Sequence, residues 1–262
     1  MIEQPLQTND TPYRPEKNSG PPFKVAIVIP VYNHADRLPG VIEAALALAM
    51  PVIVVDDGSS DGAVTAAGRF PSVTVLRHAR NQGKGGALLT GFMAASKLAD
   101  WALTIDADGQ HIPADATSLI HAVPPGTRPI VVGRRTGMHD QAGVPWTSRF
   151  GRGFSNFWVR CAGGPRLSDT QSGFRLYPLP ETLRLNVRAR RYQYEVEVLV
   201  KARWHGMAVH EAPVGVEYQA GGRRVSHFRP FVDFCRNSAT FSRLIAQRVF
   251  LFGRLSGKTS SP

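Results

Sequence analysis

The 262-residue sequence contains only two cysteines, Cys161 and Cys235. Two distant cysteines are too few for a disulfide framework and form no CxxC clip for a metal ion, which suits a reducing compartment. We therefore expect a cytoplasmic protein. Hydrophobic residues make up 43% of the sequence and charged residues 19%, close to the averages of soluble globular proteins, so a fibrous or wholly disordered chain is excluded.

Long hydrophobic runs are also missing from the sequence. No uncharged apolar stretch reaches the ~18 residues that a membrane-spanning helix needs, so we expect no transmembrane segment. Residues 1–22 contain five prolines among polar residues and lack the apolar core of a signal peptide. Their composition predicts a disordered N-terminal tail.

The charge is distributed unevenly along the sequence. Residues 1–127 carry 9 Lys and Arg against 12 Asp and Glu, a net charge of −3, whereas residues 128–262 carry 22 against 8, a net charge of +14. A basic half of this kind favours an anionic partner, such as nucleic acid, an acidic membrane surface or a phosphorylated substrate. Because no helix-turn-helix, RRM or zinc pattern accompanies the charge, we expect no nucleic acid partner.

Short β-branched runs alternate with helical segments in the first half of the sequence. The predicted strands there are residues 25–30, 52–55, 73–76 and 101–105, and the predicted helices are residues 35–49, 63–69 and 85–99. This alternation predicts an α/β fold with a mainly parallel sheet flanked by helices, in which ligands bind at the carboxyl ends of the strands. In the second half we predict strands at 130–132, 174–177 and 209–218, the last an edge strand around Pro213, and helices at 147–161 and 194–204.

Two acidic loops follow predicted strands at this same edge of the sheet. One contains Asp56, Asp57 and Asp61, and the other has Asp106 and Asp108 separated by one residue. Either loop alone is also explained by turn formation and helix capping, for which Asp is favoured. Two acidic loops at one edge instead favour an anionic cleft in which a divalent cation holds a diphosphate.

Residues 81–86, Asn-Gln-Gly-Lys-Gly-Gly, open the predicted helix after the third strand. Glycines there permit close backbone approach, and a helix N-terminus favours an anion, so Lys84 is a candidate anion-binding residue. The segment does not match G-x-x-x-x-G-K-[ST], and no GxGxxG follows the first strand. A nucleotide-binding P-loop and a standard dinucleotide site are therefore disfavoured.

The motifs, taken in chain order, resemble those of family-2 inverting glycosyltransferases with the GT-A fold. The first four are Val28-Ile-Pro-Val-Tyr-Asn33, Val55-Asp-Asp-Gly-Ser-Ser-Asp61, Asn81-Gln-Gly-Lys-Gly85 and Asp106-Ala-Asp-Gly-Gln-His111. Three further motifs resemble the branch that includes dolichyl-phosphate mannose synthases and bacterial polyprenyl-phosphate hexosyltransferases. These are Val132-Gly-Arg-Arg135, Asp169-Thr-Gln-Ser-Gly-Phe-Arg175 and Tyr194-Glu-Val-Glu197. The resemblance covers about residues 24–230.

The resemblance implies binding residues for a nucleotide-diphosphate sugar donor and a metal ion. The donor-binding residues implied at the base, ribose and diphosphate are Pro30, Tyr32, Asp57 and Lys84. The ligands implied for a Mg²⁺ or Mn²⁺ ion are Asp106, Asp108 and Gln110. Asp106 and Asp108 are catalytic candidates as well, because a metal that they hold would stabilise charge on the leaving phosphate.

The resemblance also implies anion-binding residues in the basic half. Arg135 is similar to a phosphate-binding arginine of that branch and is the third catalytic candidate. A basic segment that closes over the donor diphosphate or the acceptor phosphate contains Arg223, Arg224 and Ser226, and further arginine candidates are Arg149, Arg152 and Arg175. Glu195 and Glu197 point in different directions on a predicted helix, so we expect one to support the basic site and the other to be surface or buried polar.

The predicted activity is metal-dependent transfer of a hexose, with inversion, to a polyprenyl phosphate at the membrane surface. Such an acceptor is already anionic and needs arginines rather than a catalytic base. The alternative is a hydroxyl acceptor on a glycan, lipid or small molecule of cell-envelope biosynthesis, with Glu195 or Asp169 as the base.

The C-terminal segment has an aromatic pattern punctuated by arginine. Its apolar positions recur at intervals of three to seven residues and are Phe231, Phe234, Phe241, Ile245 and Phe252. This stripe predicts an amphipathic helix that either packs on the core or lies on an anionic membrane surface. We accordingly divide the chain into a tail at 1–22, a GT-A catalytic domain at 23–227, and an amphipathic helix and tail at 228–262. Peripheral attachment to the inner face of the cell membrane is the expected location.

Overall fold

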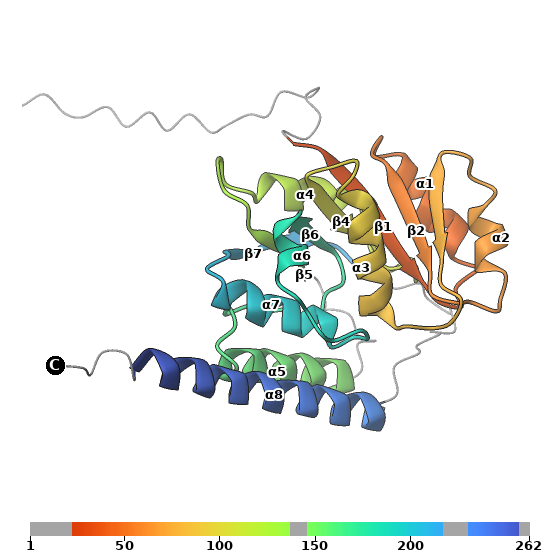
Figure 1. The fold of residues 1–262 in the computed structure, drawn as a ribbon. Coiled ribbons are helices and arrows are strands. Elements are labelled where there is room, and N and C mark those ends of the chain that lie inside the picture. Colours follow the sequence, from red (N-terminus) through yellow and green to blue (C-terminus); the bar gives the residue numbers. More distant parts are fainter. Residues whose placement is uncertain (1–22, 137–145, 217–229, 257–262) are drawn as a thin grey trace, which may run out of the picture.

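The computed structural model describes residues 23–136, 146–216 and 230–256. Within these ranges a seven-stranded sheet has the order β3-β2-β1-β4-β6-β5-β7 (Figure 1). The strands are β1 (Val25–Val31), β2 (Val52–Asp56), β3 (Val73–Arg77), β4 (Trp101–Thr104), β5 (Ile130–Arg135), β6 (Arg175–Pro178) and β7 (Val209–Val214). Neighbouring strands pair in parallel except around β6, which runs antiparallel to both β4 and β5.

Helices cover both faces of the sheet. The helices on one face are α1 (Leu38–Leu46), α2 (Ala63–Ala67) and α4 (Ala116–His121), the last preceded by the 3-10 turn η1 (Pro113–Asp115). The helices on the other face are α3 (Lys84–Ala95), α6 (Glu181–Arg184) and α7 (Tyr194–Trp204). A further layer packs on α7 and consists of α5 (Trp146–Cys161) and α8 (Pro230–Ser256) (Figure 1).

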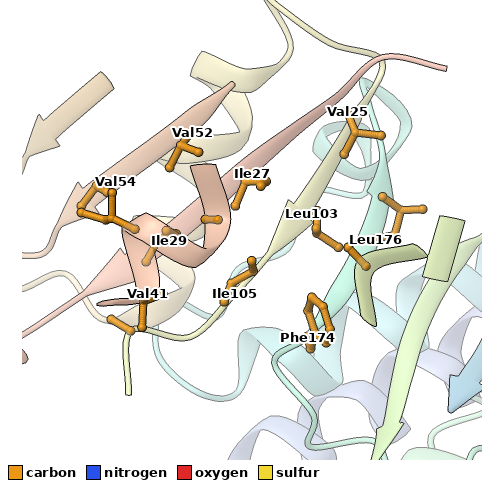
Figure 2. Packing of buried hydrophobic residues seen from close by; sticks show 14 of the residues in the cluster. Val25, Ile27, Ile29, Val41, Val52, Val54, Leu103, Ile105, Phe174 and Leu176 are labelled. Atoms are coloured by element: carbon orange, nitrogen blue, oxygen red, sulfur yellow. The ribbon is translucent and has the colours of Figure 1, made fainter. Parts of the chain in front are cut away.

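Strand β1 shows how the sequence produces this layering. Val25, Ile27 and Ile29 point to the face covered by α1, where they pack with other branched side chains (Figure 2). Ala26 and Val28 point to the opposite face and join the cluster under α3. Because side chains alternate along a strand and both faces are covered, β1 is a continuous apolar run rather than an alternating one. Burying each branched side chain contributes about 1.5–3 kcal/mol.

The predicted fold class is confirmed, with differences at particular elements. Helix α1 begins at Leu38 rather than at residue 35, because the Ala35 N–H donates to Asp61 Oδ2 at 2.7 Å and holds the preceding residues in a loop. The short helices α4 and α6 were not predicted from the sequence. Strand β7 forms one edge of the sheet around Pro213, as predicted, but it ends at Val214, short of the predicted end at residue 218.

Helix α8 uses its apolar stripe to pack inward where its side chains are described. Phe241 and Leu244 are buried against α5 and α7, and the Phe241 ring stacks on Trp158 with centroids 6.3 Å apart. Ile245 is partly buried in the same cluster, so inward packing is confirmed for this part of the stripe. Three further predictions fall outside the described residues. They concern the side chains of Phe231, Phe234 and Phe252, the tail at 1–22, and the division between 227 and 228. No helix in the described ranges is both long and apolar enough to cross a bilayer.

Candidate functional site

The predicted site residues come from loops at one edge of the sheet. Strands β1, β2, β3, β4 and β5 end there, and β6 begins there because it runs in the opposite direction. The loops after β1 and β2 are joined by hydrogen bonds: Asn33 N–H donates to Ser59 Oγ at 3.0 Å, and Ser60 N–H donates to Asn33 Oδ1 at 2.9 Å. This edge is the place where ligands of parallel α/β sheets bind.

Asp57 fixes the loop that leads into α3. Its Oδ1 accepts from the Gln82 N–H at 2.8 Å and lies 2.7 Å from His78 Nδ1, and its Oδ2 accepts from the Gly83 N–H at 2.7 Å. The carboxylate is buried, so these three partners satisfy most of its acceptor capacity. In this arrangement Asp57 positions the start of α3, and the contact with a nucleotide that we predicted for it stays a prediction.

Two other residues predicted to contact the nucleotide lie beside this loop. Pro30 is buried near the end of β1, and Tyr32 is half-buried just beyond it. Both therefore lie at the ligand edge, close to the loops after β1 and β2. Their contact with a base or ribose remains a prediction.

The glycines of residues 81–86 allow close packing around Lys84. Gly83 has φ +91°, and a Cβ there would lie 2.5 Å from Arg191 Cγ. The Gly86 N–H donates to the Arg190 carbonyl at 2.8 Å. The start of α3 is thus packed against the segment that leads into α7, and this packing brings Lys84 toward the first turn of α7.

Lys84 joins carboxylates from two different elements. Its Nζ lies 2.7 Å from Asp106 Oδ1, just beyond β4, and 2.7 Å from Glu195 Oε1 on α7. His111 Nε2 lies 3.4 Å from the other Asp106 oxygen, and the imidazole ring packs on Phe174. The side chains of Lys84, Glu195 and Asp106 are 16%, 9% and 25% exposed, so Asp106 is the most accessible of the three.

The charges in this cluster stabilise one another. Burial would lower the pKa of the Lys84 ammonium, but Asp106 and Glu195 outweigh burial and raise that pKa above its ordinary value. Burial would likewise raise the pKa of Asp106, but Lys84 and His111 outweigh burial and hold that pKa below its usual range. Lys84 is therefore a cation and Asp106 an anion at neutral pH.

The neighbouring Asp108 is held by its own loop. Its Oδ1 accepts from the Gln110 N–H at 3.0 Å, and its carbonyl accepts from Arg37 Nη1 at 3.1 Å. Asp106, Asp108 and Gln110 offer carboxylate and amide oxygens, the donor set that suits Mg²⁺ or Mn²⁺. Among the described residues no three His, Cys, Asp or Glu side chains form a metal-binding group. A hard cation that keeps several waters and is held by one or two carboxylates and substrate phosphates fits such a site.

Residues 169–175 connect the acidic cluster to the basic side of the site. A Cβ on Gly173 would lie 2.4 Å from Asp106 Oδ2 and 2.7 Å from Lys84 Nζ, so a larger residue there would displace this ion pair. At the start of the segment, Asp169 binds Arg135 through two contacts, at 2.7 Å and 2.9 Å. Glu211 on β7 accepts hydrogen bonds from the backbone N–H groups of Ser168 and Asp169.

Arg135 is thereby placed at the ligand edge by a bidentate ion pair. The Asp169 carboxylate is 1% exposed, whereas the Arg135 side chain keeps 18% exposure. Arg134, the preceding residue of β5, is exposed on the other side of the strand. The predicted anion-binding arginine is therefore held by a buried carboxylate, and its side chain is partly exposed.

Arg175 is a structural residue, in contrast to our expectation of an anion-binding role. It is fully buried and donates hydrogen bonds to the carbonyls of Ser172, Glu195 and Thr170, at 2.6, 2.7 and 2.9 Å, and to the Tyr177 hydroxyl at 3.3 Å. Burial would lower the pKa of its guanidinium, but Tyr177, Glu195 and Asp169 raise it. Arg175 thus ties residues 169–173 to the first turn of α7.

The two glutamates of α7 point in different directions, as their spacing predicted, but Glu195 lies beside the acidic cluster and not at the basic site. Glu195 supports the site through Lys84. Glu197 is fully buried and accepts hydrogen bonds from the N–H groups of Arg188 and Ala189 and from the Arg243 guanidinium of α8. Burial would raise the pKa of Glu197, but these hydrogen bonds lower it. Glu197 therefore connects α7 to α8 within the protein interior.

Several predicted site residues cannot be placed. Arg223, Arg224 and Ser226 lie outside the described residues, and so do the side chains of Arg149 and Arg152. The pairing of Lys84 with Asp106 and Glu195 was not found from the sequence, where Lys84 was assigned to an anion. The sequence signal that could have predicted this pairing was the opposite charge of Lys84 and of the acidic residues in the motifs at 106–111 and 194–197.

Comparisons with known proteins identify the family. The family model Glycosyl transferase family 2 matches residues 26–179. The UDP-N-acetylglucosamine–dolichyl-phosphate N-acetylglucosaminyltransferase of Methanococcus voltae is 29% identical over 215 residues, 74% of this chain and 86% of that protein. The undecaprenyl-phosphate mannosyltransferase of Micrococcus luteus is 31% identical over 218 residues, 78% and 88% of the two chains.

Solved structures confirm the predicted GT-A fold. Mannosyl-3-phosphoglycerate synthase from Rubrobacter xylanophilus has a TM-score of 0.64 at 22% identity, covering 88% of this chain and 75% of that one. Glucosyl-3-phosphoglycerate synthase from Mycobacterium tuberculosis, in complex with Mn²⁺, UDP and glucosyl-3-phosphoglycerate, has a TM-score of 0.62 at 21% identity, with coverage of 90% and 84%. With a family model that matches more than half of its length, the chain belongs to glycosyl transferase family 2.

Proposed function

We propose that this glycosyltransferase moves a hexose from a nucleotide-diphosphate sugar to a polyprenyl phosphate at the membrane surface, with inversion at the sugar. Relatives that match about three quarters of the chain carry dolichyl-phosphate and undecaprenyl-phosphate in their names. The choice of acceptor rests on the ion pairs that the two candidate bases, Asp169 and Glu195, form with basic residues. Asp169 is bound by Arg135 and Glu195 by Lys84, an arrangement that suits an acceptor needing no deprotonation.

In this proposal acidic residues hold the metal ion, and a basic residue binds the acceptor phosphate. Asp106, Asp108 and Gln110 would hold a divalent ion, and the structural neighbour from M. tuberculosis was solved in complexes that contain Mn²⁺ or Mg²⁺ together with UDP. Such an ion supplies Lewis-acid stabilisation of the charge that develops on the leaving diphosphate. Arg135 orients the acceptor phosphate, whose oxygen attacks the anomeric carbon of the sugar. Asp169 keeps the guanidinium of Arg135 in its orientation.

Peripheral attachment to the membrane follows from this acceptor and from the outer layer of the protein. Phe157 on α5 and Val249 and Phe250 on α8 are 57%, 64% and 74% exposed. Helix α5 contains arginines and no acidic residue, and α8 contains only one acidic residue, Asp233. Exposed apolar side chains on a basic layer fit an interface with anionic lipid.

Transfer to lipid tests the proposal directly. The full chain is incubated with Mn²⁺, a panel of nucleotide sugars and anionic vesicles with or without polyprenyl phosphate, and nucleotide release is measured. We expect release that depends on the polyprenyl phosphate and a labelled sugar that co-sediments with the vesicles. Equal release without the lipid phosphate, with sugar on a soluble hydroxyl compound, would instead establish the hydroxyl acceptor.

Replacement of Arg135 by Lys tests the basic side. Lysine keeps the charge but lacks the planar fork that binds Asp169 and a phosphate together. We expect the KM for the polyprenyl phosphate to rise about tenfold, because a hydrogen bond to a charged group is worth roughly 1.5–3 kcal/mol. The KM for the nucleotide sugar should stay the same. The matched control is Arg134→Lys on the exposed side of β5, and a change in donor KM alone would contradict the assignment.

A further inference from the structure

Lys84 occupies the position of an internal counter-ion at the predicted metal site. One ammonium group lies between Asp106 and Glu195, at 2.7 Å from an oxygen of each. The sequence pattern had assigned Lys84 to an anionic group of the donor. In the structure its positive charge is directed at Asp106, a carboxylate that a divalent ion would use, and its contact with the donor stays a prediction.

The surrounding structure fixes Lys84 in this place. Asp57 accepts from the N–H groups of Gln82 and Gly83, directly before the helix that Lys84 begins. Gly173 closes the opposite side, where an added Cβ would lie 2.7 Å from Lys84 Nζ. The ammonium is therefore confined to the neighbourhood of its two carboxylates.

We propose that Lys84 competes with the divalent ion for Asp106 and thereby makes metal binding dependent on the nucleotide diphosphate. A cation that approaches Asp106 meets the positive charge of Lys84 within the same small site. Glu195 stays beside Lys84 and compensates its charge when Asp106 turns to the metal. The phosphates of the donor bring the negative charge that lets both cations remain.

This inference rests on the metal-dependent function proposed above, but its consequence concerns metal binding alone. The free protein should bind a divalent ion weakly, and the nucleotide should strengthen that binding. If Lys84 were only a ligand of the donor phosphates, its removal would weaken nucleotide binding and leave the affinity for the bare ion unchanged. The two roles therefore differ in a measurement that involves no sugar transfer.

The experiment is a Mn²⁺ titration of the full chain, followed by electron paramagnetic resonance of free Mn²⁺, with and without UDP. For Lys84→Met we expect the dissociation constant of Mn²⁺ without nucleotide to fall about tenfold, because a like charge beside the ion has been removed. We also expect UDP to strengthen Mn²⁺ binding less in this variant than in the wild type. An unchanged or weaker affinity for the bare ion would overturn the proposal.

Two further variants keep the test decisive. Lys97→Met removes an exposed lysine beyond the end of α3 and should leave the Mn²⁺ affinity unchanged. If Lys84→Met does not fold, Glu195→Gln serves instead. In that variant Asp106 is the one carboxylate left to Lys84, so Mn²⁺ binding without nucleotide should weaken. An unchanged Mn²⁺ affinity would overturn the proposal. A wild-type protein that shows these metal effects but no lipid-dependent transfer would refute only the proposed acceptor.

Discussion

Asp108→Asn is expected to lower kcat by about 10²–10³-fold, the loss typical when one group that stabilises transition-state charge is removed. Asparagine keeps the shape of the side chain and an oxygen that can accept from the Gln110 N–H, as the Asp108 carboxylate does at 3.0 Å. The loop should therefore persist while the anionic ligand that we propose for the metal is lost. Initial rates of nucleotide release at saturating donor, acceptor and Mn²⁺ measure this effect.

The control for this variant is Asp100→Asn. Asp100 is an exposed carboxylate that precedes β4, at the opposite end of the strand from Asp106 and Asp108. The same change of charge there should leave kcat unaltered. Near-normal turnover by the Asp108 variant would contradict a role for this residue in the metal site. Circular dichroism of both variants tests whether the loss of kcat at Asp108 reflects unfolding.

Arg175→Met should lower the free energy of unfolding by about 3 kcal/mol or more, because each buried carbonyl that loses its donor costs about 1–3 kcal/mol. Methionine fills part of the volume but leaves the carbonyls of Thr170, Ser172 and Glu195 without their donor. Arg175→Lys should rescue little, because a lysine cannot reach three separate carbonyls with a planar fork. Urea unfolding followed by tryptophan fluorescence measures the change.

Arg203→Met is the matched control, since Arg203 is exposed near the end of α7. Its replacement should change the unfolding free energy by less than about 0.5 kcal/mol, as is usual for surface positions. A stability of the Arg175 variant equal to that of this control would show that the buried guanidinium does not hold residues 169–175.

The sequence was sufficient to predict the strands that build the ligand edge. Residues 25–30 and 52–55 are apolar on both faces, so the local pattern identifies them as buried strands. Their parallel pairing follows from the helix that separates them in the sequence. The antiparallel direction of β6 could not be predicted, because a four-residue strand has the same pattern in either direction. Its direction is decided by pairing with β4 and β5.

The sequence predicted which residues lie at the candidate site but not which of them form ion pairs with one another. Asp106, Asp108, Arg135 and Lys84 all lie at the predicted edge, because each follows or ends a strand, or begins the helix after one. Which cation meets which carboxylate depends on packing between distant segments, as in the contact of Lys84 with Glu195. Arg175 shows the same limit: an arginine within a basic half looks like a surface charge until its burial is known.

The reversed strand β6 has a consequence for how this site can change during evolution. Its approach segment binds Arg135 through Asp169 and packs on Asp106 through Gly173. An insertion between these two residues would disturb the groups on both flanks at once. We therefore expect residues 169–173 to tolerate substitutions more readily than a change in length.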